Sequence, residues 1–207
     1  DLRLYTTPVA MDDLDEVRHR LGYERINLYG ASYGTRAALV YMRRHPESVR
    51  AAILDGVAPP DMVMFESFSE DGQAALDKLV LDCGSEPGCA RAFPHLKTSL
   101  ETLRSSLETP RAVQVTDPVS GDLISVEMSW QTFAGGVCSL LYQPLLSSLI
   151  PLTVQRALAG DFDPFVAQVS SYDDVSDGMS AGMMLSVVCS EDIPRFKDEE
   201  SSLPGAV

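Results

Sequence analysis

The stretch Ile26-Asn27-Leu28-Tyr29-Gly30-Ala31-Ser32-Tyr33-Gly34 decides the fold of this chain. Its first four residues predict a short strand, and its last five fit the pattern Gly-x-Ser-x-Gly. In that pattern the serine lies on a tight, strained turn between a strand and a helix, at the carboxyl end of the strand. We expect Gly30 and Gly34 to let the strand and the helix approach each other without Cβ clashes.

The residues on both sides supply the context that such a turn needs. A helix is predicted over residues 35–44, where His45-Pro46 stops it, and residues 49–54 form a second strand. Upstream, Thr7-Pro8 predicts a helix start with a capping hydroxyl, and Gly22 ends that helix. Strand, turn, helix and strand in this order form a βαβ unit of a parallel sheet.

The composition of the chain limits the kinds of partner that we expect it to bind. The chain has 207 residues, 45% of them hydrophobic, which is typical of a globular protein. Its 30 acidic residues outnumber its 16 basic ones and give a net charge of −14, so we expect no nucleic-acid partner and no anionic membrane surface. No stretch approaches the roughly 20 apolar residues of a membrane-spanning helix.

After Pro60 the pattern becomes mostly helical. We expect residues 61–186 to form a helical cap inserted into an α/β core, whose two parts are residues 1–60 and 187–207. Gly135-Gly136 is expected to interrupt the helical pattern, and Val187-Val188-Cys189 to return to extended chain. Helices are predicted at residues 65–81, 96–107 and 145–159, and a small hairpin at residues 113–115 and 123–126.

The four cysteines give information on the cellular compartment in which the protein works. Cys83 and Cys89 flank a turn-rich loop, so a local disulfide is the preferred interpretation, with two reduced thiols as the alternative. A disulfide indicates an oxidising compartment. A metal site is disfavoured, because the spacing is not Cys-x-x-Cys and the nearest histidine is His95. Cys138 is expected in the core, and Cys189 is free to pair with Cys138 or with a cysteine outside this chain.

These motifs resemble those of α/β-hydrolases of the prolyl iminopeptidase and tripeptidyl aminopeptidase-like group of serine peptidases. The resemblance is strongest over residues 5–60 and weakest through the helical insertion. It implies an α/β-hydrolase fold in which a partial parallel sheet with the nucleophile turn is joined to a mostly helical cap. It is carried by residues 13–22, 27–34, 45–46 and 54–59, by the loop from Cys83 to Cys89 with Pro94, and by Val188-Cys189-Ser190-Glu191-Asp192.

The resemblance implies specific roles. Ser32 is the candidate nucleophile, against the alternative of a plain strand–helix turn, and the backbone N–H of Tyr33 is an oxyanion donor at the start of the helix. Glu191 and Asp192 are candidate substrate-binding acids, which members of this group place against the free α-amine of the substrate. The alternative for these two residues is a solvated acidic pair before Pro194.

A general base is not evident in the sequence. In these hydrolases the order along the chain is serine, acid and then histidine, whereas His19, His45 and His95 all precede Asp192. We therefore expect the catalytic Asp and His to lie outside this chain, and the chain to be an incomplete piece that is inactive alone. Asp55 is an alternative acid, although its Leu-Asp-Gly setting is typical of a structural turn.

The function that follows is a serine hydrolase, most simply an aminopeptidase that acts on short peptides through an acyl-enzyme. The alternatives are an esterase or lipase on the same fold, for which the substrate is a small ester, and a non-catalytic hydrolase-like binding protein. No metal or organic cofactor is implied. The cysteine loop favours a periplasmic or extracellular location, and the sequence leaves the oligomeric state open.

Overall fold

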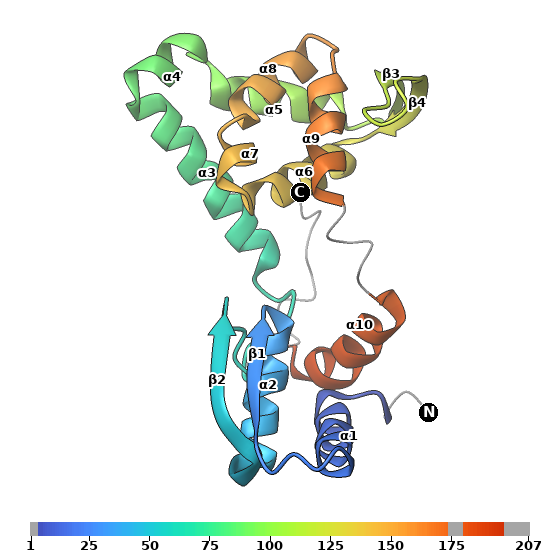
Figure 1. Cartoon of the computed structure of the whole chain (residues 1–207). Helices are drawn as coiled ribbons and strands as arrows, with labels where there is room; N and C mark the ends of the chain where they lie inside the picture. The colour runs from blue at the N-terminus through green and yellow to red at the C-terminus, as the bar shows by residue number, and fades with distance from the viewer. Residues whose placement is uncertain (1–3, 174–179, 197–207) are drawn as a thin grey trace. The chain divides into compact units, whose positions relative to one another are not determined.

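The computed structural model describes residues 4–173 and 180–196, and its contacts divide the chain into two compact units. The core unit comprises Asp1–Glu66 and the segment that begins at Ser180, and is described over residues 4–66 and 180–196. The cap unit comprises Ser67–Met179 and is described over residues 67–173. Both are shown in Figure 1.

The core unit is built on a parallel pair of strands. Strand β1 (Ile26–Ala31) pairs with β2 (Val49–Asp55), so that Tyr29 lies opposite Ile53. Helix α2 (Tyr33–Arg44) connects the two strands and packs on both of them (Figure 1). The predicted βαβ unit is therefore confirmed, with α2 starting two residues earlier than expected.

Helix α1 (Thr7–Arg20) packs against α2 through polar contacts at its side. The Tyr41 hydroxyl donates to Asp15 at 2.7 Å, and Arg44 and His45 both bind Asp12. The predicted cap at Thr7 was wrong, because Thr6 is the N-cap residue and makes no side-chain cap bond. Thr7 is instead the first helical residue, and its hydroxyl faces partners from elsewhere in the chain.

The segment that re-enters the core unit is helical. Helix α10 (Ala181–Val187) leads into a helical turn at Val188–Asp192 and a 3-10 turn at Ile193–Arg195. The prediction of extended chain at residues 187–189 was therefore wrong. A short apolar run is compatible with a buried strand or a buried helix, and periodicity alone does not separate them.

One glycine of the nucleophile turn is required by a backbone contact. A Cβ atom on Gly30 would lie 2.3 Å from the carbonyl oxygen of Gly34, far inside van der Waals distance. A Cβ on Gly34 would meet nothing within 4 Å. The expectation that both glycines avoid a clash therefore holds for Gly30 and is wrong for Gly34.

The outward face of the sheet carries exposed apolar side chains. Among the described residues this sheet has two strands, and α2 covers one of its faces. Tyr29 and Ile53, which are register partners, are 69% and 63% exposed. A two-stranded sheet with an open apolar face is a site for non-specific association.

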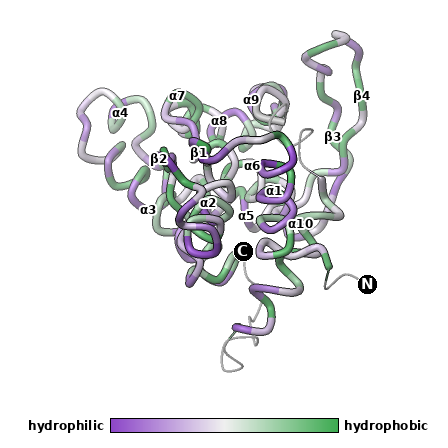
Figure 2. The backbone as a smooth tube through the Cα atoms, turned by 60° about the horizontal axis from the view of Figure 1, so that its bottom comes forward, coloured by the Kyte–Doolittle hydropathy of each residue, from purple (hydrophilic) through white to green (hydrophobic). Residues whose placement is uncertain are grey.

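The cap unit is mostly helical, and the predicted hairpin forms within it. The antiparallel hairpin is β3 (Arg111–Thr116) with β4 (Leu123–Met128). Hydrophobic and hydrophilic residues alternate from Val113 onward in β3 and from Ile124 onward in β4 (Figure 2). The predicted helix over residues 145–159 is divided, because a new helix begins at Ile150. The helices are α3 (Phe68–Ser85), α4 (Pro87–Ala92), α5 (Leu96–Ser106), α6 (Trp130–Leu141), α7 (Pro144–Ser147), α8 (Ile150–Leu158) and α9 (Asp163–Asp173).

The cap core is centred on Phe133, which is fully buried and stacks on Phe165 with ring centroids 4.6 Å apart. Helix α6 continues through Gly135-Gly136, so the predicted interruption was wrong. A Cβ on Gly136 would lie 2.4 Å from the Phe165 ring. Gly136 therefore serves close packing of α9 on α6 and does not break the helix.

The cysteines take two different states. Cys83 and Cys89 form a disulfide between the end of α3 and α4, as predicted, although the chain there is more helical than expected. Cys138 and Cys189 are both free and exposed, so the prediction that Cys138 lies in the core was wrong and the two do not pair. No helix in the described part of the chain is long and apolar enough to span a membrane.

The glycine contacts predict a difference between two matched substitutions. Gly30→Ala is expected to lower the free energy of unfolding of the core unit by about 1–3 kcal/mol, because the methyl group overlaps backbone atoms. Gly34→Ala is the control, and is expected to change it by less than about 1 kcal/mol because alanine suits a helix. Urea unfolding of both variants measures this, and equal losses would contradict the backbone-contact argument.

The open sheet face predicts the behaviour of the 207-residue chain by itself. We expect it to bind an apolar dye and to associate, and we expect the double variant Tyr29→Thr, Ile53→Thr to raise its monomer fraction. Size-exclusion chromatography and thermal melting measure both effects. A wild-type chain that stays monomeric and melts cooperatively would show that this face does not drive association.

Candidate active site

Ser32 lies between the end of β1 and the start of α2 in an unusual backbone conformation. Its φ of 50° and ψ of −120° lie outside the regions that serine ordinarily adopts. Two backbone bonds hold it there: its N–H donates to the Asp55 carbonyl at 2.9 Å, and its carbonyl accepts from the Thr35 N–H at 2.9 Å. The residue is exposed, so the turn presents its hydroxyl to solvent.

Thr35 is a second support of this turn that the sequence did not reveal. Its hydroxyl donates to the Ser32 carbonyl at 2.6 Å and accepts from the Ala58 N–H at 2.8 Å. The side chain is fully buried. Thr35 therefore ties the nucleophile turn to the loop that follows β2, and one hydroxyl satisfies a donor and an acceptor at once.

Tyr33 contributes to the site with its backbone and with its ring. As the first residue of α2 it has a backbone N–H with no acceptor inside the helix, at the positive end of the helix dipole. Its phenol oxygen lies 2.7 Å from the Thr7 hydroxyl. The pKa of Tyr33 is raised mainly because its ring is buried, and the phenol is therefore protonated at neutral pH.

Glu191 sits at the N-terminus of α1. Its carboxylate accepts from the Thr7 N–H at 2.5 Å and from the Thr7 hydroxyl at 2.9 Å. A carboxylate is favourable at a helix N-terminus, where it satisfies an orphan N–H. Glu191 is half-buried, and each of its oxygens retains a further lone pair for another donor.

Asp192 has a different environment from its neighbour. It is fully buried, and both carboxylate oxygens lie 3.1 Å from Nη1 of Arg36, which is 2% exposed. One of these oxygens also accepts from the Met64 N–H at 3.2 Å. Asp192 is thus placed in a buried ion pair, not in a solvated acidic pair, and its oxygens face protein donors and not solvent.

None of the three histidines contacts Ser32 within the described residues. Nε2 of His45 lies 3.0 Å from Asp12, His95 precedes α5, and His19 is exposed on α1. The Asp55 carboxylate accepts from the Tyr29 hydroxyl at 3.4 Å. The core unit therefore presents a nucleophile and an oxyanion donor, while no base for Ser32 is found in the part of the chain that the structure describes.

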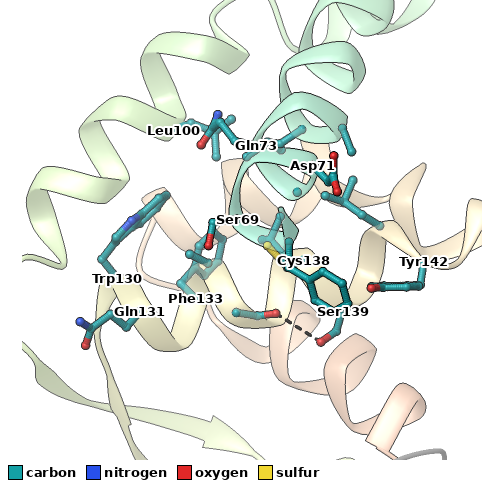
Figure 3. Close-up of a pocket in the computed structure, with 18 residues that line it drawn as sticks. Ser69, Asp71, Gln73, Leu100, Trp130, Gln131, Phe133, Cys138, Ser139 and Tyr142 are labelled. Atoms are coloured by element: carbon teal, nitrogen blue, oxygen red, sulfur yellow. Dashed lines mark hydrogen bonds between the residues drawn. The ribbon is translucent and has the colours of Figure 1, made fainter. Parts of the chain in front are cut away.

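The cap unit holds a separate cavity of about 630 Å³ (Figure 3). Aromatic and aliphatic side chains of α3 and α6 form most of its wall, together with Leu100 of α5. The free thiol of Cys138 lines it, and although the residue is exposed as a whole, partial burial of the thiol raises its pKa. The cavity is walled by the cap unit alone, and the described residues bring no three metal-ligating side chains together there or elsewhere.

Comparison with known proteins gives a match to one family model and to proteins named as peptidases. The family model described as alpha/beta hydrolase fold matches residues 3–101. Serine protease Hip1 of Mycobacterium tuberculosis (strain ATCC 25618 / H37Rv) is 28% identical over 150 residues, which cover 62% of this chain and 29% of that protein. The chain therefore spans less than a third of the length of this relative.

Two further relatives match with higher identity over a shorter stretch. Tripeptidyl aminopeptidase of Streptomyces lividans is 42% identical over 55 residues, covering 27% of this chain and 10% of the relative. A probable proline iminopeptidase of Streptomyces coelicolor (strain ATCC BAA-471 / A3(2) / M145) is 40% identical over 58 residues, covering 28% and 18%. Together with the strand–turn–helix around Ser32, these matches show that the chain carries part of an α/β-hydrolase fold.

Proposed function

We propose that this chain carries the nucleophile of a serine peptidase that releases residues from the free amino terminus of short peptides. The observation that carries the proposal is the exposed Ser32, held with φ of 50° between β1 and the N-terminus of α2. The relatives named tripeptidyl aminopeptidase, proline iminopeptidase and serine protease support the choice of peptide substrates.

The reaction proceeds through an acyl-enzyme. The Ser32 hydroxyl oxygen attacks the scissile carbonyl carbon, and its proton passes to a histidine base that lies outside the described residues. The Tyr33 N–H donates to the oxyanion of the tetrahedral intermediate, where the helix dipole adds to the stabilisation. The C–N bond then breaks, the amine leaves with the proton, and a water molecule hydrolyses the ester to free Ser32.

Recognition of a free amine is assigned to Glu191. Its half-buried carboxylate keeps lone pairs beyond the two bonds to Thr7, and an ammonium group pairs well with a carboxylate that is partly shielded from water. Asp192 is not assigned this role, because both of its oxygens are bound to Arg36 and its side chain is fully buried. The net charge of −14 further favours cationic over anionic substrates.

We also propose that the protein works in an oxidising compartment, either the periplasm or the outside of the cell. The Cys83–Cys89 disulfide supports this location, since such bonds persist where thiols are not kept reduced.

The test uses the protein expressed from its full reading frame. A fluorophosphonate is expected to label Ser32 and to leave Ser32→Ala unlabelled. Peptide anilides with a free amine are expected to be cleaved with kcat/KM at least about 10-fold above their N-acetylated counterparts, because burial of an unpaired partner at the amine site is costly. Glu191→Gln is expected to remove most of this preference, and the exposed Glu47→Gln is the control.

Three results would overturn parts of this proposal. Absence of labelling in the wild-type protein would favour a non-catalytic binding protein. A preference for blocked or fatty acyl esters would favour an esterase on the same fold. A free-amine preference that survives Glu191→Gln would place amine recognition on another residue.

A further inference from the structure

We infer that Arg36 is a positioning residue, whose guanidinium fixes the nucleophile turn against the two segments that leave and re-enter the core unit. These are the exit segment, residues 60–64, and the return segment, residues 188–195. The inference rests on the proposed function, since it assigns Arg36 a role in the reactivity of Ser32. It concerns contacts within the core unit alone.

Arg36 occupies the first turn of α2, four residues after Ser32. Its Nη1 atom donates to both carboxylate oxygens of Asp192 in the return segment, each at 3.1 Å. The other terminal nitrogen, Nη2, donates to the Met62 carbonyl in the exit segment at 2.5 Å. One planar group thus joins three pieces of chain, and its fixed fork makes the geometry specific.

The exit and return segments are also bound directly to each other. Arg195 donates to the carbonyl oxygens of Pro60, Asp61 and Met62 at 2.7–2.9 Å. Asp192 accepts from the Met64 N–H at 3.2 Å. Segments more than 120 residues apart are therefore held by side-chain bonds to backbone groups, and Arg36 links this assembly to the nucleophile helix.

A second connection from the return segment reaches the same turn. Glu191 binds Thr7, and the Thr7 hydroxyl lies 2.7 Å from the Tyr33 phenol. Of two consecutive residues of the return segment, Asp192 thus binds Arg36 directly, and Glu191 is connected to Tyr33 through Thr7. Tyr33 and Arg36 both lie in the first turn of α2. The backbone N–H proposed for the oxyanion belongs to that turn.

Stability alone is a weak reason for this ion pair. The desolvation of a buried Arg and Asp offsets much of their attraction, and well-packed apolar replacements are often as stable or more so. The Nε atom of Arg36 is buried and has no protein acceptor within the described residues. The guanidinium forms directed hydrogen bonds to Asp192 and Met62, which an apolar side chain could not form. Such bonds set the position of α2.

The position of α2 bears directly on the chemistry. Ser32 and the Tyr33 N–H must both approach one substrate carbonyl, and a displacement of about 1 Å costs on the order of 100-fold in rate. Arg36 therefore touches no substrate and acts through the placement of this turn. Its loss is expected to lower kcat with little effect on KM.

The test separates positioning from stability with the double variant Arg36→Met, Asp192→Leu in the protein from its full reading frame. Each single variant leaves a buried charge without its partner and is expected to lower Tm. The double variant removes both charges and is expected to regain most of the lost Tm. Its kcat and its rate of Ser32 labelling are expected to stay about 100-fold below wild type, with KM within about twofold.

Arg36→Lys provides the second measurement, which also applies if the double variant does not fold. Lysine keeps the charge but loses the planar fork, so labelling of Ser32 is expected to slow by about 10-fold at nearly unchanged Tm. Wild-type labelling and kcat in the double variant or in Arg36→Lys would overturn the inference. Failure of the wild-type protein to label is a separate result, which overturns the proposed function itself.

Discussion

The structure of the core unit depends on the close passage of β1 past the start of α2. At Gly30 the backbone of the strand lies so near the carbonyl of Gly34 that no side chain fits between them. This contact forces the chain to reverse within three residues, and the serine at its centre takes a positive φ. Without it, Ser32 would continue the strand or join the helix, and its hydroxyl would not be presented at the end of the sheet.

Such a conformation costs on the order of 1–3 kcal/mol and persists only where the surroundings fix it. Here the supports come from three directions. The end of β2 accepts the Ser32 N–H, the Thr35 hydroxyl binds the Ser32 carbonyl, and the loop after β2 binds that hydroxyl through Ala58. These supports of Ser32 therefore come from α2 and from the strand and loop that follow it in sequence.

The sequence predicted what local pattern controls and missed what distant partners control. The turn at Ser32, the two parallel strands, the hairpin and the Cys83–Cys89 bond follow from spacing and turn residues, and all are present. The ties of Thr35 to Ala58 and of Arg36 to Asp192 join residues 23 and 156 positions apart, so no periodicity contains them. The prediction of a helix break at Gly135-Gly136 was wrong for a related reason. The ring of Phe165, a distant residue, requires a glycine at position 136, and the helix itself does not.

Glu191 and Asp192 show why residue type and adjacency do not suffice to assign a site. Both are acids in one short segment, and as a sequence they form a single feature. Because that segment is a π-helical turn, successive side chains point in different directions around its axis. One carboxylate consequently reaches the N-terminus of α1, half-buried and with lone pairs remaining, whereas the other enters the interior and pairs with Arg36. A ligand role suits the first and a positioning role the second, and the backbone conformation of the return segment makes that division.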